Sequence, residues 1–584
     1  MKRQHYTYIL AALVAGLIAV MAMPRKEAVE PFDAAAIQRV MGGMTGRFDA
    51  WLAARQRDSL ANKLDSISGH LTFTDGTAAK GVVVSDGTSC TRTDSTGRYA
   101  LLRDKKARFV FYTVPSDCEV PVHSDSDRTA FFYQPVTRRR ATYDFRLTRL
   151  PGGIERNYRM IVIGDPQVTN AMNPFYTGSN DNLVKKSDVA RFNDETMTDI
   201  RRTIAALPAA TPVYGLSMGD NVQYYGGYNS ELQQQIRAAL GSSRMRLFSV
   251  IGNHDQDGSA LYRSKWEQCW GPTDYSFNRG NEHYVCLNNV QFTRHKSYYS
   301  PGELTDRQMK WLRQDLALTP RHMRVVLCYH IPLTFGTAPG AKASPLGIAS
   351  EEGHYYSSRL PELLKLLNQY EGGYELFCGH THFAMHHEIE VNGERVVEHC
   401  HAAACGNIWQ SNINICGTPN GYYVYTFDDE RLADCYYKGT FWPVTRQMTL
   451  FRAATDFNGE SYANDWNLPH DTGLIVANVF NADSRWDITV VENGLEHPMH
   501  RISSCGQDAF ATGYHHKYCQ AMPYRFVSKQ NGYLVMNHLF YYEPHSRDSR
   551  LTVRARDPYG HIYECNTAEV VTVPFYNFAH YYRR

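Results

Sequence analysis

Five short apolar runs mark the middle of the chain, and each is followed at once by polar residues. The runs span residues 159–163, 213–218, 247–251, 323–329 and 375–378. Apolar runs of this length, bounded by turn residues, are typical of strands buried on both faces of a sheet. We therefore predict that the polar residues after them meet at the carboxyl ends of neighbouring strands, as one cluster.

The residues after these runs are of the types that bind divalent metal ions. In chain order they are Gly164-Asp165-Pro166-Gln167, Gly219-Asp220-Asn221, Gly252-Asn253-His254-Asp255, His330 and Gly379-His380-Thr381-His382. Hard divalent ions take carboxylate and amide oxygens, and borderline ions add imidazole. Asp220 is the natural bridge between two ions, and the lack of Cys in the motifs disfavours a thiolate zinc site. We expect the glycines before the ligands to absorb the turn from strand to loop. Each motif alone is a common turn or core feature, so only their conjunction predicts a two-metal hydrolase.

This ordered series resembles the calcineurin-like metallophosphoesterases, in particular the bacterial exported type with amino-terminal and carboxy-terminal β modules. The resemblance implies two divalent metal ions, with Mn, Fe, Zn, Mg and Ca all open as their identity. The implied ligands are Asp165, Gln167, Asp220 and His382 for one ion, and Asp220, Asn253, His330 and His380 for the other. The resemblance also implies that His254 is the catalytic histidine beside the phosphate, and that Asn253 helps to bind the negative charge that develops there.

Two positions depart from the commonest pattern of that family. Gln167 stands where many relatives have a metal-binding His, and its amide oxygen is a harder donor that favours manganese, calcium or magnesium over zinc. Gln223 stands where several relatives carry an Asp that orients the catalytic histidine. Asp255 and Asp257 are therefore candidates to orient His254 instead.

The expected fold is α/β (α+β): a four-layer metallophosphoesterase β-sandwich core with flanking helices, plus two all-β accessory domains. Residues 66–150 contain short alternating stretches between turn signals, which predict a β-sandwich resembling carboxypeptidase regulatory domains. The core is expected at 157–434 and the C-terminal β domain at 435–584. Within the core, the pattern predicts helices at 194–207 and 361–370, and a capping box at Thr305 opens a third.

The amino terminus predicts export. Lys2 and Arg3 precede an uncharged apolar run over residues 9–23, which is typical of a signal-peptide core and short for a membrane span. Residues 1–23 are thus a signal peptide or an anchor, and the protein is expected in the periplasm, in the cell envelope or outside the cell. Residues 33–65 predict a helical stalk. Of the 13 cysteines, Cys505 and Cys519 could pair, and so could two of Cys400, Cys405 and Cys416.

Charge and loop composition narrow the function. Lys and Arg number 61 against 59 Asp and Glu, so the chain lacks the basic excess of a nucleic-acid binder, and no specific nucleic-acid partner is expected. Loop residues Asn407 and Trp409 are candidate substrate contacts, as are Tyr176 and Tyr355, with ordinary packing as the alternative. The main hypothesis is an exported phosphoesterase that hydrolyses phosphate monoesters or diesters by attack of metal-bound hydroxide. The alternative is an inert cell-envelope protein on the same fold that binds glycans or proteins.

Overall fold

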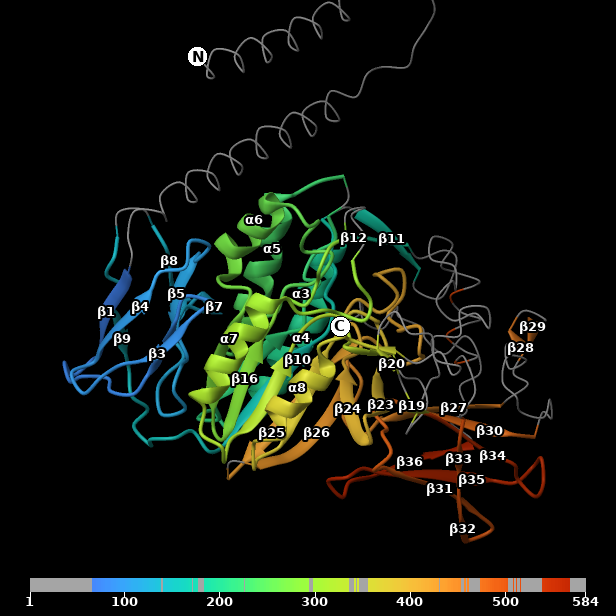
Figure 1. Ribbon diagram of the computed structural model, residues 1–584. Coiled ribbons are helices and arrows are strands. Elements are labelled where there is room, and N and C mark those ends of the chain that lie inside the picture. The colour runs from blue at the N-terminus through green and yellow to red at the C-terminus, as the bar shows by residue number, and fades with distance from the viewer. Residues whose placement is uncertain are drawn as a thin grey trace, which may run out of the picture. The chain divides into compact units, whose positions relative to one another are not determined.

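The computed structural model describes residues 66–567 with internal gaps, and Figure 1 shows its elements. The gaps are 138–139, 171, 177–182, 225, 294–297, 336–340, 343, 346–354, 430, 453–455, 458–459, 462–472, 503–507, 509–510, 512–514 and 516–537. The predicted signal segment and stalk lie outside the described residues, as do Cys505 and Cys519. The chain divides into two compact units, Met1–Asp49 and Ala50–Arg584, and every described residue belongs to the second.

The first core sheet has seven strands in the order β26-β25-β10-β13-β14-β7-β6. Its strands are β10 (Tyr158–Ile163), β13 (Val213–Ser217), β14 (Arg246–Ser249), β25 (Gly421–Asp428), β26 (Arg431–Gly439), β6 (Val122–Ser124) and β7 (Asp127–Ala130). The strands β10, β13 and β14 run parallel, so their carboxyl ends meet at one edge. This confirms the first three predicted strands.

The second core sheet also has seven strands, in the order β15-β16-β17-β22-β24-β23-β19. They are β15 (Tyr275–Arg279), β16 (Glu282–Cys286), β17 (Arg324–Cys328), β22 (Tyr374–Cys378), β23 (Met385–Val391), β24 (Glu394–Cys400) and β19 (Ala341–Lys342). The other two predicted strands are β17 and β22, which pair in parallel. Both sheets thus present parallel strand ends to the predicted cluster.

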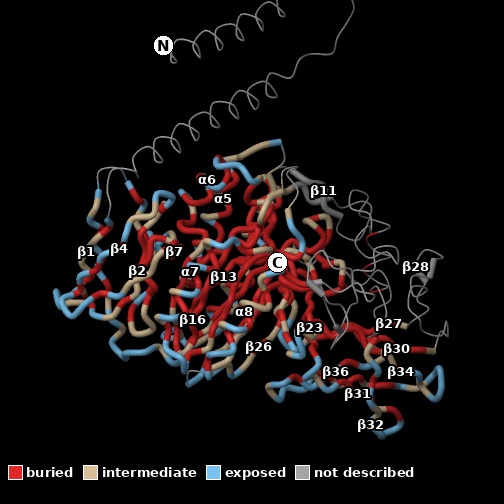
Figure 2. The backbone as a smooth tube through the Cα atoms, viewed as in Figure 1, coloured by how far each residue is buried: buried red, intermediate tan, exposed pale blue. Residues whose placement is uncertain are grey.

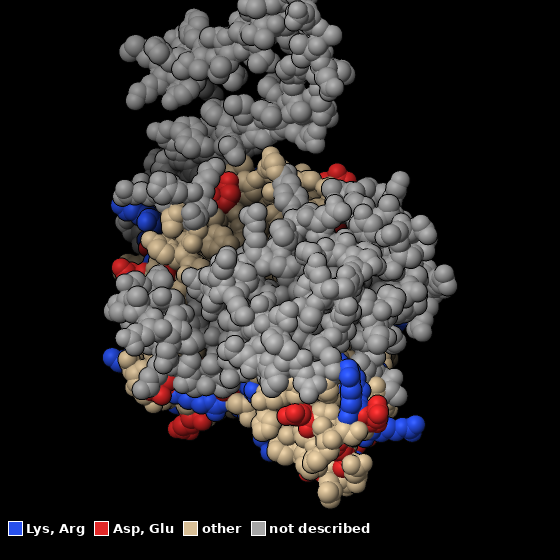
Figure 3. Space-filling model, turned by 90° about the vertical axis from the view of Figure 1, so that its right-hand side faces the viewer, with Lys and Arg blue, Asp and Glu red and all other residues tan. Residues whose placement is uncertain are grey.

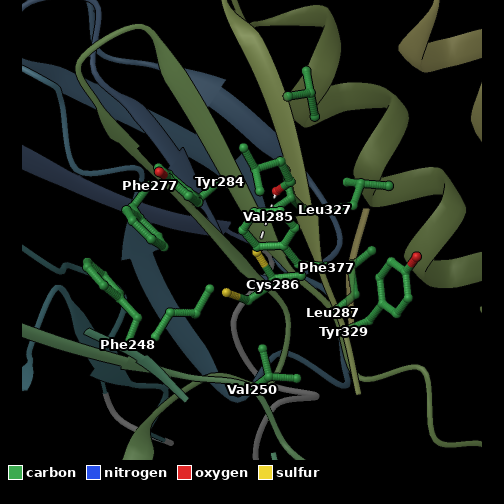
Figure 4. Packing of buried hydrophobic residues seen from close by; sticks show 14 of the residues in the cluster. Phe248, Val250, Phe277, Tyr284, Val285, Cys286, Leu287, Leu327, Tyr329 and Phe377 are labelled. Carbon is green, nitrogen blue, oxygen red and sulfur yellow. Dashed lines mark hydrogen bonds between the residues drawn. The ribbon is translucent and has the colours of Figure 1, made fainter. Parts of the chain in front are cut away.

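Side chains alternate between the two faces of each strand, so each core strand can bury one apolar face against the other sheet and one against the helices. On β10, Met160 and Val162 belong to the cluster of core residues between the sheets, whereas Ile161 and Ile163 pack with the helices. Between the sheets, the ring of Phe248 on β14 stacks on Phe277 of β15 with centroids 3.6 Å apart (Figure 4). Figure 2 shows that buried backbone is concentrated in these central strands.

Helices cover the sandwich, which makes the core a four-layer fold. They are α3 (Asp188–Asp194), α4 (Thr196–Ala206), α5 (Ser230–Gly241), α6 (Ala260–Trp270), α7 (Asp306–Ala317) and α8 (Leu360–Leu367). The predicted capping box is present, because the Thr305 side chain accepts from the Gln308 backbone and the Gln308 side chain accepts in return. The helix expected at 194–207 begins two residues later than predicted, because α3 ends at Asp194 and Glu195 separates it from α4.

The N-terminal module contains two small sheets, β4-β1-β9 and β3-β2-β5-β8. Their strands are β1 (Ser66–Phe73), β2 (Val83–Ser85), β3 (Cys90–Arg92), β4 (Arg98–Leu102), β5 (Phe109–Tyr112), β8 (Tyr133–Pro135) and β9 (Phe145–Leu147). The predicted range 66–150 is not self-contained, because β7 pairs with β14 through Thr129 and Leu247. Trp311 of α7 also donates from Nε1 to Ser85 Oγ at 2.9 Å. The module and the core therefore share a sheet and a buried interface.

The C-terminal module contains the sheets β27-β30-β34-β33 and β32-β31-β35-β36. Its strands are β27 (Met448–Arg452), β30 (Ile475–Val479), β31 (Asp487–Glu492), β32 (Leu495–Pro498), β33 (His500–Arg501), β34 (Leu539–Tyr542), β35 (Leu551–Arg556) and β36 (Ile562–Asn566). The boundary expected at 434/435 falls inside β26, which pairs with β25 as far as Gly439. The structure therefore moves the end of the core sheet to Gly439.

Short strands complete the described chain. They are β11 (Met172–Tyr176), β12 (Leu183–Ser187), β18 (Thr334–Phe335), β20 (Ser344–Pro345), β21 (Tyr355–Tyr356), β28 (Asp456–Phe457) and β29 (Glu460–Ser461). Cys400, at the end of β24, and the loop residues Cys405 and Cys416 are free thiols, so the predicted bridge between two of them is absent. None of the helices in the described ranges is both long and apolar enough to span a bilayer.

Candidate metal centre

The predicted ligands converge at the carboxyl ends of strands from both sheets. Sheet one supplies Asp165 and Gln167 after β10, Asp220 after β13, and Asn253 and His254 after β14; sheet two supplies His330 after β17, and His380 and His382 after β22. One ligand atom each from Asp220, His330 and His380 lies within 4.8 Å of the others. Within this trio, the structure brings together residues that are up to 160 positions apart in the sequence.

Asn253 lies at the centre of this trio. Its Oδ1 is 2.9 Å from Nε2 of His330 and 2.8 Å from Nδ1 of His380. Nδ1 of His330 donates to the carbonyl oxygen of Met218 at 2.9 Å, which leaves Nε2 to face the cluster. A backbone acceptor on the far nitrogen is the usual way in which a protein fixes the orientation of a metal-binding histidine.

Two buried carboxylates face the imidazoles. Oδ2 of Asp220 is 3.1 Å from Nε2 of His330, and Oδ1 of Asp165 is 3.7 Å from Nε2 of His382. The backbone amide of His254 donates to Oδ1 of Asp220 at 2.7 Å. Asp220 therefore reaches the loops of both sheets, which agrees with its predicted bridging position.

Five predicted ligands have left-handed backbone conformations. They are Asp165 (φ 35), Gln167 (φ 38), Asp220 (φ 48), His380 (φ 72) and His382 (φ 62). Such conformations are uncommon outside glycine and cost on the order of 1–3 kcal/mol each when the residue is strained. We expected the glycine before each ligand to adopt the turn conformation. Instead, the ligand residues themselves have positive φ, and Gly219 is the one preceding glycine that also does. Strain of this kind concentrates at functional sites.

The glycine before Asn253 is required for space. A Cβ atom on Gly252 would lie 2.1 Å from Oδ1 and 2.2 Å from the backbone nitrogen of Asp220. No side chain can be accommodated at that distance from backbone, so any substitution displaces Asp220. The glycine thus allows the loops after β13 and β14 to approach closely.

The carboxylates of Asp220 and Asp165 raise the pKa of His330 to about 10, whereas burial has the opposite effect on the other two cluster histidines. Burial lowers the pKa of His382 to about 4, and burial together with the neighbouring His330 lowers the pKa of His380 well below its ordinary value. Both rings are therefore neutral at pH 7, which is the form that coordinates a metal. Burial raises the pKa of Asp165 well above its ordinary value. A bound cation would favour the ionised carboxylate.

The side-chain amide of Gln167 is held by Gln223. Its Nε2 donates to Oε1 of Gln223 at 2.7 Å, while its Oε1 is buried without a hydrogen bond. Oδ2 of Asp220 is also buried without a hydrogen bond, although it lies 3.1 Å from Nε2 of His330. Buried oxygens without partners are costly unless a cation or a donor occupies the site. These oxygens and the neutral imidazoles fit divalent metal ions.

His254 lies at the edge of the cluster rather than inside it. Its side chain is 37% exposed, and Nε2 is 4.0 Å from Oδ2 of Asp220. The two predicted orienting residues bond to the backbone instead: Asp255 accepts from the amides of Gly252 and Val222, and Asp257 accepts from that of Ser259. Those carboxylates hold the loop, and Asp220 is the carboxylate nearest to the ring of His254 among the recorded ion pairs.

The candidate substrate contacts Asn407 and Trp409 are buried, each 1% exposed. Trp409 Nε1 donates to the carbonyl oxygen of Pro166 at 2.8 Å, and the guanidinium of Arg191 lies 4.9 Å from the indole centroid. Packing therefore occupies the ring of Trp409, which corrects its role from stacking to support of the loop. Oδ1 of Asn407 is buried without a hydrogen bond. The side chains of Tyr176 and Tyr355 lie outside the described part of the chain.

Sequence reasoning missed two residues beside the ligands. The ring of Tyr298 packs edge-on against His380 with centroids 5.6 Å apart, and Sγ of Cys405 lies 3.8 Å from Nδ1 of His382. Both residues lie in loops that contain no recognisable motif, so the sequence gives no signal for their position beside the ligands. Four histidines near the last motif have structural partners: His386 pairs with His399, His387 with Thr334, and His401 with Tyr425.

Three regions of the chain match models of one protein family. Residues 158–384 match the family described as calcineurin-like phosphoesterase, residues 65–150 match its N-terminal region and residues 398–563 match its C-terminal region. The chain belongs to the calcineurin-like phosphoesterases with N- and C-terminal modules. No curated protein matches the chain.

Among solved structures, the chain is similar to the NAD nucleotidase NadN of Haemophilus influenzae, with 10% sequence identity and a TM-score of 0.26. The alignment covers 49% of this chain and 49% of that structure, so the chain spans about half the length of its structural neighbour.

Proposed function

We propose that this protein is an exported phosphoesterase that uses two divalent metal ions to hydrolyse phosphate monoesters or diesters. One observation carries the proposal: Asn253 Oδ1 lies 2.9 Å and 2.8 Å from imidazole nitrogens of His330 and His380, beside the buried carboxylate of Asp220. Four loops from two sheets thus place oxygen and nitrogen donors around one point.

The family assigns two ion positions, and the ligands for both are present. Asp165, Gln167, Asp220 and His382 would hold one ion, and Asp220, Asn253, His330 and His380 the other. When bound, divalent ions polarise a phosphoryl oxygen and lower the pKa of water towards 7. The hard oxygen of Gln167 favours manganese, magnesium or calcium at the first position over zinc.

The side chains of the protein supply the remaining steps. The exposed ring of His254 can hold a proton at Nε2 and donate it to the leaving oxygen of the ester. The amide of Asn253 lies where it can stabilise charge on the phosphoryl group. The rigid loops, fixed by Gly252 and by the left-handed ligands, keep these groups in place before substrate arrives.

The partner that these residues favour is a phosphate ester, with no specific nucleic acid. On the described part of the face in Figure 3, acidic and basic side chains are interspersed. Export is supported by the basic start and the apolar run over residues 9–23, which also allow membrane anchoring. Cell fractionation tests it: the full chain should leave the cytoplasm, and a chain without residues 1–30 should stay there. Equal export of both would rule out this signal.

Activity with added metals tests the catalytic proposal. Purified full-length protein should hydrolyse p-nitrophenyl phosphate or bis(p-nitrophenyl) phosphate with at least one of manganese, iron, zinc, magnesium or calcium. Asp220→Asn should lose bound metal and turnover together, while Asp125→Asn, at a fully exposed carboxylate, should match the wild type. Full turnover and full metal content in Asp220→Asn would disprove the bridge. A folded wild-type protein that is inactive with every metal and ester would favour the inert binding protein.

A further inference from the structure

A cleft of about 520 Å³ lies between the N-terminal module and the core. The module contributes lining residues from the segments 86–87 and 106–111, and the core contributes residues between 256 and 308. Gln256, three residues after Asn253, is one of them. The cleft therefore begins on the loop that carries His254, but it contains none of the predicted metal ligands.

A line of rings connects the cleft to the metal cluster. Gly258 packs so closely against Phe292 that a Cβ atom would lie 2.8 Å from its ring. The ring of Phe292 contacts Tyr298 with centroids 6.2 Å apart, and Tyr298 contacts His380 at 5.6 Å. Phe292 lines the cleft, so ring contacts link one wall of the cleft to a predicted metal ligand.

Basic side chains from three parts of the chain line this cleft. Lys106 and Arg108 come from the N-terminal module, Arg263 from α6 and Arg307 from α7. The buried carboxylate of Glu267 pairs with both Arg108 and Arg263, so one negative charge faces two guanidinium groups. Nη2 of Arg108 is buried without a hydrogen bond. No ion pair of Lys106 is recorded within the described ranges.

The other carboxylates of the cleft are already occupied by donors. Asp86 accepts from the backbone amides of Thr88 and Ser89. Asp274 accepts from the backbone amide of Asn288 and the side-chain amide of Gln308. These hydrogen bonds stabilise both carboxylates, and Arg307 pairs with Asp104 at 3.6 Å. Among the lining residues, four basic side chains face three carboxylates, which leaves a net charge of +1.

The start of α6 adds to the positive field. The helix begins at Ala260 inside the cleft wall, its N-cap Ser259 makes no side-chain capping bond, and its first turn contains no acidic residue. Free amide groups at a helix start favour an anion, and arginine pairs well with phosphate or carboxylate oxygens.

We propose that this cleft binds a second anionic group, a phosphate or a carboxylate, of the phosphoester whose scissile phosphate lies at the metal cluster. The inference rests on the proposed function and names its substrate class: esters with two anionic groups joined by a polar body. Lys106 then gives the N-terminal module a direct part in substrate selection.

Steady-state kinetics with a matched pair of lysine variants test this proposal. The wild type should have a kcat/KM for fructose 1,6-bisphosphate about tenfold above that for fructose 6-phosphate, as one charged contact would give. In Lys106→Met this ratio should fall towards one. Lys105→Met removes the same charge from the neighbouring exposed residue, which does not line the cleft, and should keep the wild-type ratio.

Binding measurements separate this inference from the proposed function. Calorimetry with the metal-loaded full chain should show about tenfold weaker binding of fructose 1,6-bisphosphate to Lys106→Met than to Lys105→Met. If the protein hydrolyses p-nitrophenyl phosphate but does not prefer fructose 1,6-bisphosphate over fructose 6-phosphate, the proposal for the cleft is wrong and the proposed function still stands. If inorganic sulfate activates turnover and does not compete with the bisphosphate, the cleft binds a separate anion, and the proposal for the cleft is again wrong. If no ester is hydrolysed, the proposed function fails, and the calorimetric comparison still decides whether the cleft binds the second anion.

Discussion

The indole Nε1 of Trp409 donates a 2.8 Å hydrogen bond to the carbonyl oxygen of Pro166, the residue between the predicted ligands Asp165 and Gln167. Trp409 itself has a left-handed backbone (φ 61), as does Ile408 before it (φ 45). Arg191 holds the same segment, because it donates to the carbonyl oxygen of Trp409 at 2.5 Å. A strained loop that is distant in sequence thus fixes the backbone of the first metal-binding motif.

Trp409→Phe should therefore weaken metal binding without a change in any ligand. Partners of this kind typically contribute about ten- to a hundredfold in metal affinity. Titration calorimetry with manganese checks the expected loss, and circular dichroism checks the fold. Trp442→Phe, at a tryptophan that packs on Phe480, is the control and should bind manganese like the wild type. Unchanged affinity in Trp409→Phe would show that the hydrogen bond to Pro166 is dispensable.

Replacement of Gln167 should change metal preference. In Gln167→His an imidazole replaces a hard amide oxygen, so the activity ranking should shift towards zinc or iron. Gln223→Leu removes the acceptor that fixes the amide, so it should weaken manganese binding about tenfold and keep the ranking. The ranking is measured with apo-protein reloaded with each metal. Gln234→His, on the exposed face of α5, is the control. An identical ranking in Gln167→His would argue against direct ligation.

His254→Ala should keep the metal ions and the fold but lose turnover. The expected loss is roughly a hundredfold to ten-thousandfold, because the proton donor for the leaving oxygen is removed. It should be smaller on an aryl phosphate, whose leaving oxygen needs little protonation, than on an alkyl phosphate. Metal content is measured by atomic emission, with His322→Ala at an exposed position as the control. Loss of metal would make His254 a ligand, and equal losses on both esters would indicate phosphoryl binding.

Stability should depend on pH through Glu282, which is buried at the start of β16 and accepts from the Tyr158 hydroxyl at 2.9 Å. Burial raises the pKa of Glu282 from 4.5 to about 7. The folded chain then binds more protons than the unfolded chain between pH 4.5 and 7, so this contribution to stability is full below 4.5 and is lost as the pH rises to 7.

Glu282→Gln should remove this pH dependence. Relative to the wild type, the variant should gain about 3 kcal/mol of unfolding free energy between pH 4.5 and pH 8. Urea denaturation at both pH values measures the difference, with Glu119→Gln at an exposed position as the control. A constant difference between variant and wild type across that range would contradict the prediction.

The central strands of the core could be predicted from the sequence because short local patterns of apolar residues mark them. The run at 159–163 is apolar on both faces, since Met160 packs between the sheets and Ile161 packs under the helices. The motif order also located the cluster, because parallel strand ends must meet at one edge. The capping box at Thr305 is a purely local signal and is present as predicted.

Other features depend on contacts that no local pattern encodes. The pairing of Thr129 with Leu247 joins strands more than a hundred residues apart, so local patterns did not reveal the sheet that the module shares with the core. Trp409 suggested stacking because aromatic loop residues often bind ligands, but its burial depends on Arg191 and Pro166. The role of Gln223 required the distance to Gln167. The left-handed ligands likewise follow from the tertiary packing of the loops.

Strand order in the first core sheet constrains how the protein is made. β10 lies between β13 and β25, and β25 ends at Asp428. At about 5–20 residues per second, a ribosome needs roughly 13–50 s to proceed from the end of β10 to the end of β25. During that interval one edge of β10 has no partner, and unpaired edges promote aggregation. Newly made chains are therefore prone to aggregation until β25 is synthesised, which happens in the last third of the chain.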